Sequence, residues 1–216
     1  MNGNVGEKIL LLGAGGHARA CIDVIEQDGR YEIAGLIGLS SEVGGSILGY
    51  PVIGTDDDIP ELLARYSFGV VTIGQIKTPE PRIRLYEALL RNGRRTPAIV
   101  SPLAYVSRHA SVGCGTVVLH GAVINAGAVV GQNCIINSLS LVEHDAQIGD
   151  HCHIATGARV NSAVHIGDGT FVGSGCTIRQ GLAIGRNCVI GMGLPVLSDC
   201  ADGTQLPLKR RNTCPT

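Results

Sequence analysis

Aliphatic residues recur at a fixed interval along the second half of the chain. From Val100 to Val196, every sixth residue is valine or isoleucine, and the residue two places before each of them is usually small. A six-residue period is typical of a hexapeptide β-helix, in which short strands wrap a triangular prism and each strand supplies one inward side chain. The pattern therefore predicts about five stacked coils of three strands, with no loop inserted between Val100 and Val196.

Glycine marks one corner of this predicted prism. Residues eighteen apart stack on one another when three hexapeptides make a coil, and glycine recurs at that interval at Gly113, Gly131, Gly149, Gly167 and Gly185. Glycine at a fixed corner is expected where the backbone needs unusual dihedral angles or leaves no room for a side chain.

The first hundred residues follow a different pattern, in which apolar runs alternate with segments whose apolar residues have helical spacing. The expected strands are 8–12, 32–37 and 68–73, with a last strand at 96–100 that leads into the prism, and the expected helices are 17–27, 57–65 and 81–92. This alternation predicts a small Rossmann-like parallel α/β domain over residues 1–98. A parallel β-helix domain with a C-terminal tail follows over residues 99–216.

A glycine-rich turn joins the first expected strand to the first expected helix. Gly13, Gly15 and Ala18 match the G-x-G-x-x-A fingerprint, which offers backbone N–H groups at a helix N-terminus to a diphosphate, and His17 adds a side-chain donor. The second strand ends in Leu36-Ile-Gly-Leu39 without the acidic residue of a full dinucleotide site. The turn therefore indicates a diphosphate site, with close packing of the turn as the alternative.

Composition and charge exclude several classes of function. The formal net charge is −1, so no overall basic field indicates nucleic-acid binding, and no apolar run approaches the roughly 20 residues of a membrane span. Five of the eight cysteines occupy small positions of the prism, and the N-terminus shows no signal-peptide pattern. We therefore expect a reduced, cytoplasmic protein. The other cysteines, Cys21, Cys114 and Cys214, lack the spacing of a zinc site, so no metal is expected.

His144 is the candidate for chemistry among the histidines of the prism. Glu143 and Asp145 flank it in a chain of which only 16% is charged. A neighbouring carboxylate orients an imidazole and stabilises its protonated form, which is what a general base requires.

Four segments together resemble one known family. They are Gly13-Ala-Gly-Gly-His-Ala18, Asn137-Ser-Leu-Ser-Leu-Val-Glu-His-Asp145, Ile148-Gly-Asp150 and His153-Ile-Ala-Thr-Gly-Ala158. This combination is similar to the sialic acid O-acetyltransferase and nucleotide-aminosugar N-acetyltransferase family of bacterial surface-glycan pathways. The resemblance implies a left-handed β-helix and transfer of acetyl from acetyl-CoA, as co-substrate, to the amine of a nucleotide-linked amino-dideoxy sugar. It also implies a homotrimer with active sites between subunits.

The resemblance also implies roles for individual residues. His144 matches the general base for direct attack on the thioester, with Glu143 or Asp145 to orient it. The other implied groups are Gly13, Gly15 and His17 at the nucleotide diphosphate, Asn137 near the acceptor sugar, and Gly157, His153 and Ser162 on the acetyl-CoA side.

Two positions depart from the family pattern. Ser162 stands where the family usually has a glycine whose N–H polarises the acetyl carbonyl, and a backbone N–H survives that change. Gly38 stands at the end of the second strand, where relatives commonly have an acidic residue that touches the nucleotide base.

Three other functions stay open at the level of sequence. Sialic acid O-acetylation would use the same machinery on a hydroxyl acceptor. A γ carbonic anhydrase-like zinc lyase would need three histidine ligands, but the residue five places after His144 is Gly149. A non-catalytic sugar-nucleotide binding scaffold would leave the Glu143-His144 pair without a purpose.

Overall fold

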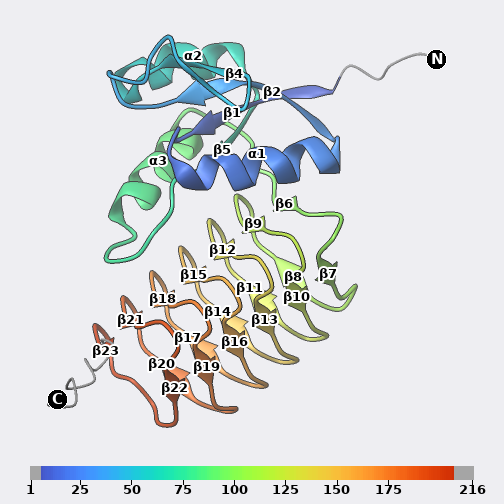
Figure 1. The fold of residues 1–216 in the computed structure, drawn as a ribbon, viewed down its shortest axis with the longest axis vertical. Coiled ribbons are helices and arrows are strands. Elements are labelled where there is room, and N and C mark those ends of the chain that lie inside the picture. The colour runs from blue at the N-terminus through green and yellow to red at the C-terminus, as the bar shows by residue number, and fades with distance from the viewer. Residues whose placement is uncertain (1–5, 207–216) are drawn as a thin grey trace, which may run out of the picture.

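The computed structural model describes residues 6–206 and folds them into an α/β domain that lies along one side of a long prism, over its first coils (Figure 1). Cys214 and the basic tail residues lie outside the described part of the chain. Within the described part, no helix has the length and apolar character needed to cross a membrane.

A five-stranded sheet forms the centre of the α/β domain, in the order β3-β4-β2-β1-β5. Four strands are parallel, and β3 pairs antiparallel with β4. The strands are β1 (Glu7–Leu12), β2 (Tyr31–Ile37), β3 (Ser46–Ile47), β4 (Tyr50–Gly54) and β5 (Phe68–Val71), and the helices are α1 (Gly16–Asp28), α2 (Ile59–Arg65) and α3 (Glu80–Arg91), with a 3-10 turn at Asp56–Asp58. The expected alternation of strand and helix is confirmed.

Both faces of this sheet are covered, which explains the continuous apolar run of β1. Ile9 and Leu11 pack with α1 on one face, whereas Leu10 and Leu12 pack with α2 and α3 on the other. A parallel sheet with helices on both faces buries successive residues on opposite sides, so all four are completely buried.

Two features of this domain differ from the sequence expectation. The hairpin of β3 and β4 was not expected, because Pro51 and the glycines around it are typical of a loop. The segment 96–100 does not extend the sheet: only Arg95 bridges to Phe68, and Ile99–Val100 is the first strand of the prism. Pro97 lacks a backbone donor, and beyond it the N–H of Ile99 donates to Thr116 inside the prism.

In the part of the chain that the structure describes, eighteen two-residue strands build the prism in three parallel sheets. The seven-stranded sheet holds β6 (Ile99–Val100), β9 (Val117–Val118), β12 (Ile135–Ile136), β15 (His153–Ile154), β18 (Phe171–Val172), β21 (Val189–Ile190) and β23 (Gln205–Leu206). The six-stranded sheet holds β7 (Tyr105–Val106), β10 (Val123–Ile124), β13 (Leu141–Val142), β16 (Arg159–Val160), β19 (Thr177–Ile178) and β22 (Pro195–Val196). The five-stranded sheet holds β8 (Ser111–Val112), β11 (Val129–Val130), β14 (Gln147–Ile148), β17 (His165–Ile166) and β20 (Ala183–Ile184).

The register confirms the six-residue period. Paired strands are eighteen residues apart, as for Val123 and Leu141, and no loop interrupts the strands between Val100 and Val196. Eighteen strands in three sheets make six coils rather than the five expected. The last coil is shorter, because Val189 pairs with Gln205, sixteen residues further along.

The inner column and the glycine corner have simple packing causes. The aliphatic residues and the small residues before them form one core, in which Cys134, Cys152 and Cys188 are fully buried. At the glycine corner, a Cβ on Gly113 would lie 2.5 Å from the carbonyl carbon of Gly131 in the next coil. Close approach of stacked backbones, rather than a positive φ, therefore requires glycine there.

The α/β domain and the prism share a packed junction. Ile99, Val117 and Leu119 of the prism belong to the same apolar cluster as the buried face of α1, which lies across the first coils in Figure 1. Arg82 of α3 is 1% exposed and donates to Gln75 and Asn133. Gln75 in turn donates to the carbonyl of Gly169, 2.9 Å away. These contacts fix the position of the α/β domain along the seven-stranded sheet.

Candidate functional site

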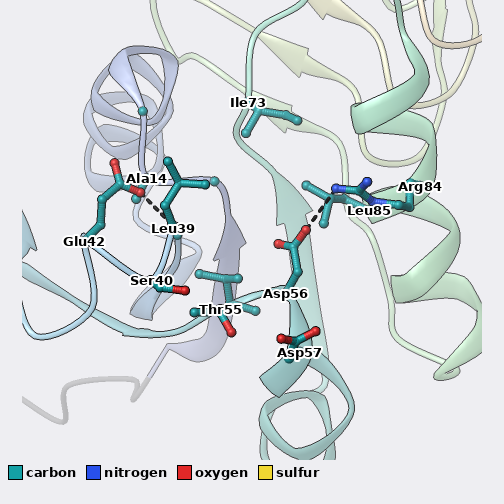
Figure 2. A pocket seen from close by; sticks show the side chains of 14 residues that line it. Ala14, Leu39, Ser40, Glu42, Thr55, Asp56, Asp57, Ile73, Arg84 and Leu85 are labelled. Carbon is teal, nitrogen blue, oxygen red and sulfur yellow. Dashed lines mark hydrogen bonds and ion pairs between the residues drawn. The ribbon is translucent and has the colours of Figure 1, made fainter.

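A cavity of 470 Å³ opens at the carboxyl ends of β1 and β2, where ligands of parallel sheets bind (Figure 2). Gly13 and Gly15, both expected at a diphosphate site, line it. Gly13 has φ +127°, and a Cβ there would collide with the side chain of Ile73, so the turn can pass β5 only with glycine. A Cβ on Gly15 would meet nothing within 4 Å, because this residue faces open space.

The start of α1 lies beside this cavity, and the first backbone N–H groups of the helix have no partner among residues 6–206. The helix begins at Gly16 without a side-chain cap and without an acidic residue in its first turn. Backbone N–H groups at such an end, together with the helix dipole, favour an anionic ligand. The geometry suits a diphosphate that crosses the turn at Gly15.

An acidic residue does reach the end of the second strand, but it comes from an unexpected position. Glu42 lines the cavity, and its Oε2 accepts a hydrogen bond of 2.7 Å from the N–H of Leu39. A Cβ on Gly38 would lie 2.7 Å from the same oxygen, so glycine at 38 leaves the space that Glu42 occupies. Only the proximity of Glu42 to the strand end could have indicated this contact from the sequence.

The wall opposite carries an ion pair that the sequence analysis also missed. Arg84 of α3 donates to Asp56 over 3.0 Å, and Asp57 follows along the same rim (Figure 2). The cavity therefore combines a glycine turn at a helix start with a mixed polar rim, and both features suit a phosphorylated polar ligand.

His17 does not line this cavity. Its ring lies 6.5 Å from that of His153, centroid to centroid, and its Nε2 is buried without a partner among the described residues. Burial, with smaller contributions from the nearby His153 and Arg82, lowers the pKa of His17 to about 3. The structure thus separates His17 from Gly13 and Gly15 and places it at the junction with the prism.

His153 and Asn137 lie together on the side of the prism that faces the α/β domain. The Nδ1 of His153 is 2.7 Å from the carbonyl oxygen of Gln75, and its Nε2 is 3.2 Å from Nδ2 of Asn137. Burial lowers the pKa of His153 to about 4, against the opposing effect of the Gln75 carbonyl. A neutral ring fits both contacts, with Nδ1–H donating to Gln75 and Nε2 accepting from Asn137.

His144 stands at a different corner, in the turn between β13 and β14. Its Nδ1 lies 2.9 Å from Oδ2 of Asp145, and its side chain is 59% exposed. Asp145 has φ 61°, which an aspartate tolerates, and Gly127 in the preceding coil leaves room for its carboxylate. The carboxylate of Asp145 therefore orients the imidazole.

Glu143 contacts a side-chain amide and a backbone N–H instead of the imidazole. Its Oε2 accepts from Nδ2 of Asn125 at 2.9 Å and from the N–H of His144 at 3.1 Å. Of the two carboxylates considered for orienting His144, the geometry selects Asp145 and gives Glu143 a supporting position in the turn.

Ser162 lies directly beside His144 in the next coil. Its Oγ is 2.8 Å from Nε2 of His144, and its backbone N–H donates to none of the residues that the structure describes. Gly157, by contrast, lies at the corner of Asn137, and its N–H donates to Ser138.

The expected site residues thus form two groups in one chain. Asn137, His153 and His17 gather where the seven-stranded sheet meets the α/β domain. His144, Asp145 and Ser162 gather at the corner between the six-stranded and five-stranded sheets. Among the residues described, no group of three or more His, Cys, Asp or Glu side chains is arranged to hold a metal ion.

Three family models match the chain. The PglD N-terminal domain matches residues 8–89, the bacterial transferase hexapeptide (six repeats) matches residues 127–162, and the hexapeptide repeat of succinyl-transferase matches residues 163–198. The comparison with curated proteins gives no match.

Several solved structures share the whole architecture. The acetyltransferase domain of PglB from Neisseria gonorrhoeae FA1090, in complex with acetyl coenzyme A, is 29% identical over 94% of this chain and 96% of that chain, with a TM-score of 0.85. PerB from Caulobacter crescentus, in complex with CoA and GDP-perosamine, is 28% identical over 94% of each chain, with a TM-score of 0.87. WeeI from Acinetobacter baumannii AYE, at 24% identity and a TM-score of 0.82, supports the fold alone.

The fold and these matches define a class of enzyme: the chain is a hexapeptide-repeat acetyltransferase with a PglD N-terminal domain. In sequence and fold the chain is similar to sugar acetyltransferases of glycan biosynthesis, and the prism is a left-handed β-helix.

Proposed function

We propose that the enzyme transfers acetyl from acetyl-CoA to the amine of a nucleotide-linked amino-dideoxy sugar, by direct attack of the amine on the thioester. The observation that carries this proposal is the hydrogen-bonded pair of His144 and Asp145, with the backbone N–H of Ser162 one coil away donating to none of the described residues. The complexes of PglB with acetyl coenzyme A and of PerB with CoA and GDP-perosamine support the two substrates.

Each group at the His144 corner has one task. Acetyl transfer from a thioester needs alignment of amine and carbonyl, removal of one proton, and a donor for the developing oxyanion. His144 is the general base, Asp145 holds its ring through Nδ1, and the backbone N–H of Ser162 polarises the acetyl carbonyl. Gly13 and Gly15 hold the nucleotide diphosphate at the start of α1.

The two groups of site residues are brought together in a homotrimer. His144 lies on one corner of the prism, whereas Asn137 and His153 lie toward the α/β domain, so one chain does not assemble the full set. Neighbouring prisms would place the corner of one subunit against the sugar and acetyl-CoA groups of the next. Light scattering at assay concentration should therefore report a trimer, and an active monomer would refute this arrangement.

The decisive test replaces His144 by alanine. The kcat should fall by about 10²- to 10⁴-fold with acetyl-CoA binding nearly unchanged, because a positioned proton acceptor contributes about that much. The residual rate should rise with pH, since hydroxide then removes the proton. His165→Ala is the matched control, because His165 is an exposed histidine of the same prism. Turnover of His144→Ala within about threefold of wild type would contradict the assignment.

The acceptor is identified by a thermal-shift panel. UDP-, GDP-, dTDP- and CMP-linked amino sugars should be compared at equal concentration, with acetyl-CoA as the positive control. Stabilisation by one nucleotide sugar, followed by acetylation of its amine, supports the proposal. Acetylation of a sialic acid hydroxyl would instead favour the O-acetyltransferase.

A further inference from the structure

The hydroxyl of Ser162 contacts Nε2 of His144, the ring nitrogen of the proposed base that does not face Asp145. A neutral imidazole has one N–H and one bare nitrogen, and a carboxylate can only accept. The 2.9 Å contact from Nδ1 of His144 to Asp145 therefore places the ring hydrogen on Nδ1, and Nε2 is the bare nitrogen. In the 2.8 Å contact between Nε2 and Oγ of Ser162, the hydroxyl must be the donor.

The serine oxygen is then the outermost atom of a hydrogen-bonded chain. Ser162 Oγ makes no other hydrogen bond to the residues that the structure describes, so its lone pairs remain available. The N–H of Ala163 donates to the carbonyl of His144 over 3.1 Å, which holds the two turns in register. The hydroxyl is thus fixed beside the imidazole by the stacking of the coils.

We propose that Ser162 is a catalytic proton relay between the acceptor amine and His144; this inference rests on the proposed function. The amine nitrogen forms its bond to the acetyl carbon and gives one proton to Oγ of Ser162. Oγ passes its own hydrogen to Nε2 of His144, so that the hydroxyl is regenerated. The C–S bond breaks, CoA leaves as the thiolate, and the proton on His144 is available to it.

The position of Ser162 favours a relay over direct contact between the amine and His144. An amine that approached Nε2 directly would have to displace the serine hydroxyl and break a 2.8 Å hydrogen bond. A glycine at this position would leave Nε2 open to the acceptor. The serine therefore adds one proton transfer to the reaction without adding a covalent intermediate.

The test compares Ser162→Gly with the wild type by a proton inventory, in which kcat is measured in mixtures of H₂O and D₂O. When two protons move together, the plot of kcat against the fraction of D₂O is curved. When a single proton moves to His144, this plot is a straight line. We expect the wild type to be curved and Ser162→Gly to be linear, with kcat lower by about tenfold or more. Ser174→Gly is the matched control, since Ser174 occupies the same place in its hexapeptide in another turn, and its side chain makes no hydrogen bond to the residues that the structure describes. It should leave both kcat and the curvature unchanged.

Two results would overturn the relay. One is a Ser162→Gly enzyme with the same kcat and the same curved proton inventory as the wild type, which would show that the hydroxyl takes no part in the proton transfer. The other is wild-type protein that gains the mass of one acetyl group at Ser162 when it is incubated with acetyl-CoA alone, which would make the serine a nucleophile. His144→Ala distinguishes failure of the relay from failure of the proposed function. Full activity of that variant would show that His144 is not the general base.

Discussion

Mild acidification should destabilise the folded chain because two buried histidines must stay neutral. The folded-state pKa is about 3 for His17 and about 4 for His153, against an ordinary value of 6.5, and burial is the main cause of both shifts. Below pH 6.5, the ordinary pKa that both histidines have in the unfolded chain, the unfolded chain binds a proton at each of them and the folded chain does not. The stabilisation is therefore fully present above about pH 6.5 and is lost as the pH falls toward the folded values.

The size of the effect follows from these pKa values. Between about pH 7 and pH 5.5, each histidine should lower the free energy of unfolding by about 1 kcal/mol, and both together by about 2–3 kcal/mol. Half-buried His151 adds to the same trend, because burial also lowers its pKa. This loss is a substantial part of the stability of an ordinary domain.

Urea unfolding at the two pH values measures this loss. His17→Gln and His153→Gln should each reduce the difference between the two pH values by about half, because each variant removes one titrating group. His165→Gln, at an exposed position of the prism, should leave it unchanged. The protein concentration must be the same throughout, since subunit association contributes to apparent stability. If His17→Gln and His153→Gln both lose as much free energy of unfolding between the two pH values as the wild type does, the reasoning is refuted.

Three further changes test the junction and the site. Arg82→Met should lower the free energy of unfolding by about 2–4 kcal/mol in urea titrations, because it leaves buried acceptors of Gln75 and Asn133 without a donor. Arg84 is exposed, so Arg84→Met should lower the free energy of unfolding by less than about 1 kcal/mol. Gly15→Ala should keep its melting temperature but raise KM for the nucleotide sugar in steady-state kinetics, because the new methyl group enters open space beside α1. Asp145→Asn should retain the backbone conformation and lower kcat by about 10²-fold, since the amide no longer fixes the ring hydrogen on Nδ1 of His144; an unchanged kcat would show that Asp145 does not orient the base.

The prism was predictable because the six-residue period of the sequence corresponds to one short strand on each side of a triangular coil. One aliphatic residue per strand and one small residue before it fill a triangular interior, and the pattern from Val100 to Val196 specifies both. The same period contained a signal that could have placed Ser162 beside His144, since residues eighteen apart stack on one face. Because the resemblance implies a glycine at this position, the sequence predicted a role for the backbone N–H of Ser162 and none for its hydroxyl.

The contacts that were missed join segments with no common period. His17 and His153 are far apart in sequence and meet only because α1 and the loop at Gln75 pack on the seven-stranded sheet. Glu42 returns to Leu39 through a loop whose sequence has no motif. Such contacts depend on how the two domains and their loops pack, which neither hydrophobic periodicity nor a short fingerprint records.

The exposure of His144 is itself a reason to expect assembly. In water, a hydrogen-bonded pair such as His144 and Asp145 gains little from its mutual attraction, because the solvent screens it. A neighbouring prism over this corner would exclude water, strengthen the contacts from Asp145 to His144 and from His144 to Ser162, and prevent hydrolysis of the thioester. We therefore expect the chemistry to depend on the covering surface as much as on the residues themselves, so that dissociation should abolish activity while each chain keeps its fold.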